Sequence, residues 1–231
     1  MSETPTPLIS VIIPALNEAR EIGKTLDSLP PGGRVEKIVV DGGSSDNTAA
    51  IARKKADRVL SGPSGKARQM NAGAQAASGR TFLFLHADSR LPAGAFDAIQ
   101  TRLEDPAVIG GAFDLVIDSP RIVLRLLGRA ANIRSRLTGV PYGDQGIFIR
   151  RDAFERLGGY PEIPLMEDLE LGRRMKRAGR MVFLSQPIRT SSRRWDREGV
   201  GLTTLRNQVF VLLYFLGMDP ARLARWYRPI R

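Results

Sequence analysis

The chain has 231 residues, 42% hydrophobic and 26% charged, as expected of a soluble globular protein with one sizeable domain or two small ones. It contains no cysteine and a single histidine, His86, which excludes a disulfide framework, a thiolate zinc site, a cysteine nucleophile and a His-rich metal centre. With 35 basic and 24 acidic residues the net charge is +11, and the whole excess lies in residues 121–231.

The first half of the sequence alternates short β-branched runs with helical patterns. Residues 8–14 form a continuous apolar run, as in a strand that is buried on both faces. Asn17 predicts a cap for a helix over residues 17–28, and Asp46 predicts a cap for a helix over residues 48–55. Further strands are expected at 37–40, 58–60 and 81–85, with a helix at 66–77. This alternation is typical of a parallel sheet with crossover helices.

The second half is less regular. Its apolar patterns predict strands at 108–117, 146–150 and 181–184, and helices at 122–137, 169–178, 202–216 and 221–227. No internal repeat or low-complexity linker divides the chain. We therefore expect a single α/β domain over residues 1–231, with a mostly parallel central sheet and helices on both faces.

Neither the N-terminal segment nor any apolar run predicts membrane insertion. Residues 1–7 are polar and contain prolines, unlike a targeting segment. The longest apolar stretch, residues 209–216, is far below the roughly 20 residues of a membrane-spanning helix. These features predict a soluble, cytoplasmic chain.

Acidic side chains follow three of the predicted strands. Glu18 follows the first, Asp41 ends the second and Asp88 follows the fourth. The carboxyl ends of parallel strands share one edge of the sheet, where ligands bind. Three carboxylates there repel one another unless cations or hydrogen-bond donors are bound. Each taken alone is more simply a helix start, a turn or a cap, so the prediction of a site depends on their joint occurrence.

A basic loop opens the predicted helix at 66–77. It contains Lys66 and Arg68, with Asn71 one turn further on. The sequence has neither the Walker A pattern here nor a Rossmann GxGxxG after the first strand. Beside a divalent cation held by carboxylates, such a loop is suited to clamp a pyrophosphate.

Four segments in chain order carry a family resemblance. They are residues 9–18 (ISVIIPALNE), 39–48 (VVDGGSSDNT), 85–88 (LHAD) and 166–168 (MED). They resemble, in this order, the opening strand, the base- and ribose-contacting motif, the metal-binding Asp-x-Asp and the Glu-Asp catalytic motif of the family 2 glycosyltransferases, which have the GT-A fold. The short chain and the segment GDQGIFIR are similar to a small bacterial subgroup linked to arsenosugar biosynthesis, with carotenoid-acid glycosyltransferases as a related alternative.

The resemblance implies an inverting, metal-dependent glycosyltransferase that moves a sugar from a nucleoside diphosphate sugar to an acceptor hydroxyl. It divides the single GT-A domain into a nucleotide-binding half at 8–115, an acceptor and catalytic half at 116–200, and C-terminal helices at 201–231.

The resemblance also implies roles for individual residues. Asp168 would be the general base, and Glu167 would orient it or the acceptor, although an acidic pair also suits any helix N-terminus. Asp88 would bind Mg²⁺ or Mn²⁺. The residues expected to hold the nucleotide sugar, with Lys66 and Arg68 facing its diphosphate, are Ala15, Asn17, Glu18, Asp41, Gly42, Ser44, Lys66, Arg68, Asn71 and His86.

The sequence departs from the family pattern at two places. His86 replaces the first Asp of Asp-x-Asp; an imidazole can contact ribose or metal, but a lone histidine at a strand end is more often a packed core residue. Ser191 replaces the Gln of the Gln-x-x-Arg-Trp motif of processive synthases, whose long membrane segments are also missing, so we expect a non-processive enzyme. The candidate contacts for acceptor or diphosphate are Gln145, Arg193, Arg194 and Trp195. A structural Arg–carboxylate pair explains Arg193 and Arg194 about as well.

The basic half needs a separate explanation. Arg206 precedes residues 209–216, and Arg222, Arg225 and Arg228 follow at helical spacing. This suits an interfacial helix at the inner face of an anionic membrane and a lipid-linked or phosphorylated acceptor. A core helix under the sheet, or a homodimer seam, explains the apolar stretch slightly better.

Two other classes of protein remain as alternatives. A basic nucleic-acid- or membrane-binding module without transferase activity would also use this charge, but no nucleic-acid partner is expected, because the few aromatics are not interleaved with basic residues. A nucleotidyltransferase would need a Gly-rich loop after the first strand, which residues 15–17 do not provide.

Overall fold

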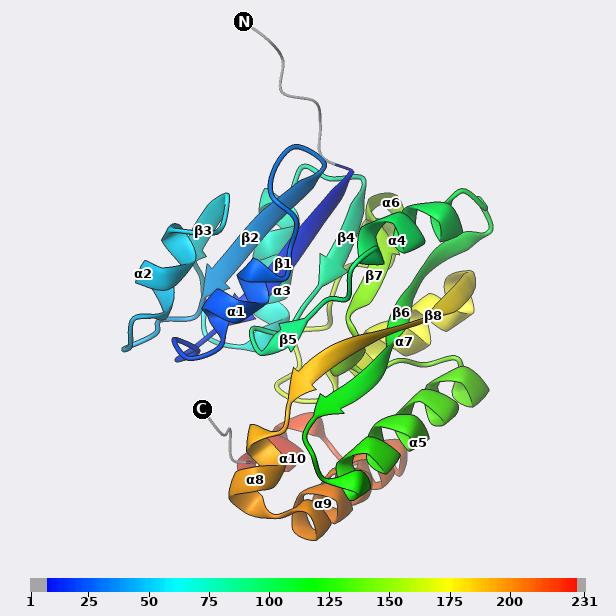
Figure 1. The fold of residues 1–231 in the computed structure, drawn as a ribbon. Coiled ribbons are helices and arrows are strands. Elements are labelled where there is room, and N and C mark those ends of the chain that lie inside the picture. Colours follow the sequence, from blue (N-terminus) through cyan, green and yellow to red (C-terminus); the bar gives the residue numbers. More distant parts are fainter. Residues whose placement is uncertain (1–7, 228–231) are drawn as a thin grey trace, which may run out of the picture.

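The computed structural model describes residues 8–227. It shows an α/β protein built on one eight-stranded sheet with the strand order β3-β2-β1-β4-β7-β6-β8-β5 (Figure 1). The predictions made for residues 1–7 and for Arg228 lie outside the described residues.

The first half forms a parallel sheet with crossover helices, as predicted. Its elements are β1 (Ile9–Ala15), α1 (Ile22–Asp27), β2 (Val35–Asp41), α2 (Thr48–Arg53), β3 (Arg58–Ser61), α3 (Lys66–Ala76) and β4 (Thr81–Phe84). β1 pairs in parallel with β2 and β4, and β2 pairs in parallel with β3. Because Ala15 lies opposite Asp41 in the register, the ends of β1 and β2 meet at one edge of the sheet.

The second half adds strands in both directions. Its elements are β5 (Ser89–Arg90), α4 (Ala95–Leu103), β6 (Val108–Asp118), α5 (Ile122–Thr138), the 3-10 turn η1 (Gly143–Gln145), β7 (Ile147–Arg150), α6 (Arg151–Arg156), α7 (Glu167–Ala178), β8 (Arg180–Ser191), α8 (Arg193–Glu198), α9 (Val200–Phe215) and α10 (Pro220–Trp226). β7 is antiparallel to β4 and β6, whereas β8 is parallel to β6 and antiparallel to β5. The sheet within residues 8–227 is therefore mixed, with parallel pairs in the majority.

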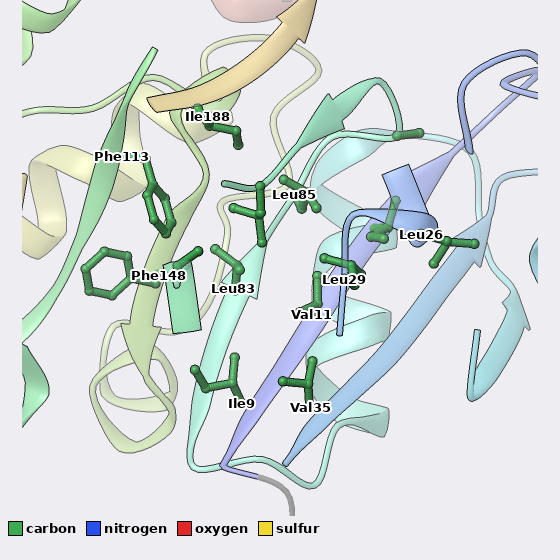
Figure 2. Close-up of a cluster of buried hydrophobic side chains, with 14 of the residues drawn as sticks. Ile9, Val11, Leu26, Leu29, Val35, Leu83, Leu85, Phe113, Phe148 and Ile188 are labelled. Carbon is green, nitrogen blue, oxygen red and sulfur yellow. The ribbon is translucent and has the colours of Figure 1, made fainter. Parts of the chain in front are cut away.

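Helices cover both faces of the sheet, as predicted. Successive side chains of β1 point to opposite faces, so Val11 joins one buried cluster with residues of α1, α4 and α5, and Ile12 joins another with residues of α3, α6 and α7. Figure 2 shows the first cluster, in which Val11 lies between Leu83 of β4 and Leu29 after α1. Both clusters hold the carboxyl ends of β1, β2 and β4 in fixed positions.

The helix after β1 is shorter than the sequence predicts. We expected it to begin at Asn17, but α1 begins at Ile22. Asn17 has a φ of +55°, and its side-chain oxygen accepts a hydrogen bond of 2.9 Å from the backbone N–H of Ser45. Asn17 therefore ties two loops together and does not cap α1. The N-cap of α2 is Asn47 and not the predicted Asp46, although the Asp46 carboxylate accepts the N–H of Thr48, the first residue of that helix, at 2.9 Å.

The last long strand exceeds its predicted bounds of 181–184. β8 continues past Pro187 to Ser191, because a register shift against β6 places Pro187 opposite Asp114 and the ladder resumes. Gly111 of β6 permits this close pairing, since a Cβ there would lie 2.0 Å from the carbonyl oxygen of Val182. The short elements β5, α6 and α8, and helix α4, were not predicted. Within residues 8–227, no helix combines the length and apolarity needed to cross a membrane.

Candidate active site

A cavity of about 630 Å³ opens where β1 and β4 end. Its walls come from the loops after these strands, from the N-terminal ends of α3 and α7, and from α8, α9 and α10 (Figure 1). Of the residues proposed from the sequence, the cavity brings together Ala15, Glu18, Lys66, His86, Asp88, Glu167, Asp168, Arg193, Arg194 and Trp195.

The rim of the cavity beside β1 is built from hydrogen bonds between two loops. The backbone N–H of Asn17 donates to Ser44 Oγ at 2.9 Å, and Ser44 Oγ donates to Asp41 Oδ1 at 2.5 Å. The N–H of Glu18 donates to Thr48 Oγ1 at 2.7 Å. Asn17, Asp41 and Ser44 therefore shape this rim, and they are not among the residues that line the cavity.

Gln69 of α3 is a cavity residue that the sequence analysis missed. Its Nε2 donates to the carbonyl oxygens of Ala15 at 2.9 Å and Val40 at 2.8 Å, which joins the ends of β1 and β2. A Cβ at Gly42 would lie 2.9 Å from Gln69 Nε2, so Gly42 leaves room for this amide and does not itself line the cavity. The interior of an Ala-rich helix offers no sequence signal for such a role.

Arg193 at the start of α8 binds two of the predicted carboxylates. Its guanidinium makes a two-point ion pair with Glu18, with Nη1 at 2.5 Å from Oε2, and its Nη2 lies 3.2 Å from Asp88 Oδ2. Burial raises the pKa of both Glu18 and Asp88, and the positive charge of Arg193 opposes that rise. The repulsion expected between acidic residues at this edge is thus relieved by an internal cation.

Lys66 and Glu167 form an ion pair in the wall of the cavity. Lys66 is the first residue of α3 and Glu167 the first of α7, and Nζ lies 3.4 Å from Oε1. Burial alone would lower the pKa of Lys66, but the carboxylates of Glu167 and Asp168 outweigh it and raise that pKa. Burial raises the pKa of Glu167, with Lys66 acting against the rise. Lys66 is therefore cationic at neutral pH.

Asp168 is held by two backbone donors. The N–H of Gly143 donates to Oδ2 at 2.6 Å, and the N–H of Leu169 donates to Oδ1 at 2.8 Å. A Cβ at position 143 would lie 2.6 Å from Asp168 Oδ2 and 3.0 Å from His86 Nε2, so this close approach requires glycine. The carboxylate also lies in the first turn of α7, where the helix dipole favours negative charge.

His86 is a neutral imidazole at the end of β4. Burial lowers its pKa well below the usual range, and the positive charges of Lys66, Arg194 and Arg193 lower it further. Its Nε2 is buried and has no hydrogen-bond partner among the atoms of residues 8–227. A buried ring nitrogen that lines a cavity is suited to a ligand contact.

Asp144 is a second cavity residue that the sequence analysis missed. Burial raises its pKa to about 6, and the negative charge of Asp168 adds to the rise. Its neighbour Tyr142 also lines the cavity, under the guanidinium of Arg134, whose Cζ lies 3.2 Å from the ring centroid. The GDQG segment did draw attention, but to Gln145 and not to Asp144.

Three other predicted site residues lie outside the cavity lining. Gln145 is fully buried, and its Oε1 accepts from Ser135 Oγ at 2.6 Å. Asn71 holds the backbone of Tyr160 through two hydrogen bonds of 2.9 Å. Arg68 pairs with Glu162 at 3.5 Å between exposed side chains. These contacts give all three residues a structural role outside the cavity.

The remaining wall is aromatic and cationic. Arg194 donates a hydrogen bond to the hydroxyl of Tyr227, and its Cζ lies 4.6 Å from the centroid of that ring. Trp195 packs against the first core cluster, and its indole N–H is buried without a partner in the described part of the chain. Tyr227 belongs to no recognised motif, and the sequence did not predict it as a site residue.

The described residues offer only a partial metal site. Within residues 8–227, no group of three or more His, Asp or Glu side chains is arranged to hold a metal ion. Asp88 supplies one carboxylate on the cavity wall, two residues after the unpartnered His86 Nε2. This set fits a divalent ion that brings its other ligands from substrate phosphates and water, as Mg²⁺ commonly does.

Solved structures define the class of fold. The chain is similar to residues 1–349 of S. aureus TarS in complex with UDP-GlcNAc, with a TM-score of 0.66 and 20% identity over 80% of this chain and 58% of that one. It is also similar to the mannosyltransferase PcManGT from Pyrobaculum calidifontis in complex with GDP-Man and Mn²⁺, with a TM-score of 0.63 and 23% identity over 80% and 57% of the two chains. The fold is the GT-A fold of glycosyltransferases, as predicted.

The sequence comparison identifies the family. The family model described as Glycosyl transferase family 2 matches residues 10–158, and the chain belongs to this family. It is 33% identical over 169 residues to the PGL/p-HBAD biosynthesis glycosyltransferase of Mycobacterium bovis, covering 67% of this chain and 63% of that protein. It is 28% identical over 178 residues to the glycosyltransferase AglE of Haloferax volcanii, covering 67% and 56%. The chain thus spans less than two thirds of the length of these relatives.

Proposed function

We propose that the chain transfers a single sugar from a nucleoside diphosphate sugar to an acceptor hydroxyl, with inversion at the anomeric carbon and without processivity. One observation carries this proposal: a single cavity combines the oriented carboxylate of Asp168 with the cations Lys66 and Arg193 and with Asp88. Family membership and the GT-A fold support it.

The cations suit a diphosphate leaving group. Breaking the bond between the sugar and the diphosphate places extra negative charge on the departing oxygen, which fixed positive charges stabilise. Lys66 is cationic at neutral pH, and Arg193 presents a fork of N–H donors that matches a phosphate. The rim made by Asn17, Asp41 and Ser44 would position the base and ribose at the end of β1.

A divalent cation would be held by Asp88 together with oxygens of the diphosphate. When bound, Mg²⁺ or Mn²⁺ neutralises charge on the leaving group. His86 Nε2 lies in the same wall and would contact the ribose, the sugar or a metal-bound water. PcManGT, of the same fold, has been solved with Mn²⁺.

Asp168 is the proposed general base. It accepts the proton of the acceptor hydroxyl while that oxygen attacks the anomeric carbon from the face opposite the diphosphate. The new C–O bond forms as the bond to the diphosphate oxygen breaks, and the electron pair leaves with the diphosphate. The two backbone N–H bonds to Asp168 fix its orientation, and Glu167 holds Lys66 in place. One carboxylate is sufficient for this inverting step.

The acceptor is proposed to be lipid-linked or phosphorylated, because the acceptor half carries the excess of arginine. The resemblance to the subgroup linked to arsenosugar biosynthesis stays a prediction.

The test of donor binding is a thermal-shift series with UDP, GDP and their sugars, with and without Mn²⁺. Because a ligand of the folded state raises the melting temperature, at least one nucleotide should stabilise the chain, and more strongly with Mn²⁺. Asp88→Asn should remove the Mn²⁺-dependent part of the shift, whereas Asp97→Asn, at an exposed position of α4, should not change it. No stabilisation by any of these compounds would contradict the proposal.

A further inference from the structure

Two helices at one end of the molecule carry exposed apolar stripes. Within residues 8–227, the exposed large apolar side chains lie on α5, on α9 with the following Leu216, and on Trp226 of α10. Figure 1 shows these three helices together at the end of the molecule formed by β6, β8 and α8. Such contiguous exposure is typical of an interaction surface.

Each stripe follows the helical repeat. On α5 it consists of Ile122, Leu126, Ile133 and Leu137, and Leu137 is 81% exposed. The opposite side of α5 packs on the sheet, where a Cβ at Gly128 would already lie 3.1 Å from the carbonyl oxygen of Leu115. The helix is therefore fixed on the sheet with its apolar stripe outward.

The structure decides against one explanation of the apolar stretch on α9. The sequence left open an interfacial helix, a core helix under the sheet and a homodimer seam. Leu202, Leu205, Val209 and Leu212 are exposed and only Thr203 and Phe210 of α9 are buried, so α9 is not a core helix. The helix is a surface element with an unpartnered apolar side.

Contacts at both ends connect α5 and α9 to the same neighbouring elements, α8 at one end and α7 at the other. Arg121, which precedes α5, pairs at 3.5 Å with Asp196 of α8, the helix before α9. At the other end, Thr138 of α5 accepts a 2.8 Å hydrogen bond from Lys176 of α7, and Tyr214 of α9 donates a 3.2 Å hydrogen bond to Glu170 of α7.

The charge of this surface identifies its partner. Neither α5 nor α9 contains an acidic residue. Arg125 and Arg129 of α5 and Arg222 and Arg225 of α10 are exposed, and none of them forms an ion pair within residues 8–227. A second copy of this chain, docked by the same face, would bring like charges together, whereas anionic lipid headgroups would neutralise them.

We propose that α5, α9 and α10 form a surface that docks on an anionic lipid bilayer, with the leucines in the headgroup region and the arginines on the lipid phosphates. This inference goes beyond the proposed transfer reaction and does not depend on it. It also has a consequence for the acceptor: Asn207, Phe210 and Val211 of α9 line the cavity. A docked molecule would therefore hold its cavity beside the membrane, where a lipid-linked hydroxyl could enter.

The experiment is co-sedimentation of the 231-residue protein with vesicles of phosphatidylcholine alone or with roughly 30% phosphatidylglycerol. We expect binding to the anionic vesicles that weakens with added salt, and little binding to the neutral ones. The double variant Arg125→Ser/Arg129→Ser should bind about 10- to 30-fold more weakly. Arg53→Ser/Arg102→Ser, with the same change of charge on exposed positions of α2 and α4, should bind like the parent.

A further variant, the oligomeric state in solution and the nucleotide thermal shift distinguish the possible outcomes. Leu205→Ser/Leu212→Ser should lose vesicle binding and keep its melting temperature, because both side chains are exposed. No binding to either vesicle, or equal losses in the two arginine double variants, would overturn the proposal. A third outcome would also overturn it: the parent binds no vesicles but forms a dimer in solution, and Leu205→Ser/Leu212→Ser dissociates that dimer. The apolar face would then bind a second copy of the chain. Nucleotide thermal shifts on the same samples measure donor binding, and so test the proposed function independently of vesicle binding.

Discussion

Arg193 and Glu18, which are 175 positions apart in the sequence, form a two-point ion pair in the wall of the cavity. The pair joins the start of α8 to the loop after β1, and the same guanidinium reaches Asp88. One side chain from the basic second half of the chain thus neutralises two carboxylates of the first half. In the function proposed above, a diphosphate would compete for the same guanidinium, so donor binding would be coupled to this ion pair.

Arg193→Ala should destabilise the fold by about 2 kcal/mol, because it leaves two largely buried carboxylates unpaired. The loss should grow with pH. Without Arg193 the pKa values of Glu18 and Asp88 rise further above their ordinary values of 4.5 and 3.8, so ionising them in the folded state becomes costlier at higher pH. Urea unfolding at about pH 4.5 and about pH 7.5 measures this difference.

Arg189→Ala is the control for that prediction. Arg189 pairs with Asp118 at 3.7 Å, with 59% of its side chain exposed, and such pairs contribute about 0–1 kcal/mol. Equal effects of the two substitutions would mean that the Arg193 pair is an ordinary surface contact.

Asp144→Asn should remove a pH dependence of stability. The carboxyl of Asp144 has a pKa of about 6 in the folded protein and an ordinary value of 3.8. Between these values the unfolded chain releases its proton first, so the free energy of unfolding falls as pH rises from about 4 to about 6, by about 3 kcal/mol at most. The variant should therefore gain stability over the parent above about pH 6 and show a flatter profile.

Urea unfolding across this pH range, with Asp97→Asn as an exposed control, checks the Asp144 prediction. If the unfolding free energies of the parent and of Asp144→Asn change with pH in parallel, the pKa of Asp144 is not raised in the folded protein.

Gly143→Ala should impair the reaction with little effect on donor binding. The added Cβ would lie 2.6 Å from Asp168 Oδ2, so the carboxylate must shift. A displacement of about 1 Å at a reacting group costs about 100-fold in rate. The measurement is nucleotide release from the donor together with the nucleotide thermal shift.

The matched control is Gly201→Ala, because no atom lies within 4 Å of a Cβ at that exposed position. If Gly143→Ala keeps full activity, the contact between Gly143 and Asp168 does not position the base.

Much of the fold and part of the cavity could be predicted from the sequence, for identifiable reasons. Buried strands are short apolar runs, and the residues that follow them, such as Ala15, His86 and Asp88, must lie at one edge of a parallel sheet. The helix beginning at Lys66 was also predicted from local pattern, whereas the Glu167–Asp168 pair was assigned to the site through its resemblance to a family motif.

The rest depends on contacts that local pattern does not encode. The choice between Asp144 and Gln145 is set by the turn η1, which directs the amide into the core and places the carboxylate on the cavity wall. The pairing of Arg193 with Glu18 joins distant segments, and Tyr227 reaches the cavity only because α10 folds back on it. The exposure of α9 could not be predicted either, because an apolar stripe looks the same whether it is covered or not.

The central claim is that Asp168 takes the proton from the acceptor in a cavity that binds a nucleoside diphosphate sugar. The most direct measurement is nucleotide release from the donor that stabilises the chain most, compared between the parent, Asp168→Asn and Asp97→Asn. We predict that Asp168→Asn lowers the rate by about 100- to 10,000-fold while its donor-induced thermal shift is kept, and that Asp97→Asn behaves like the parent. Release by Asp168→Asn at the parent rate would contradict the assignment.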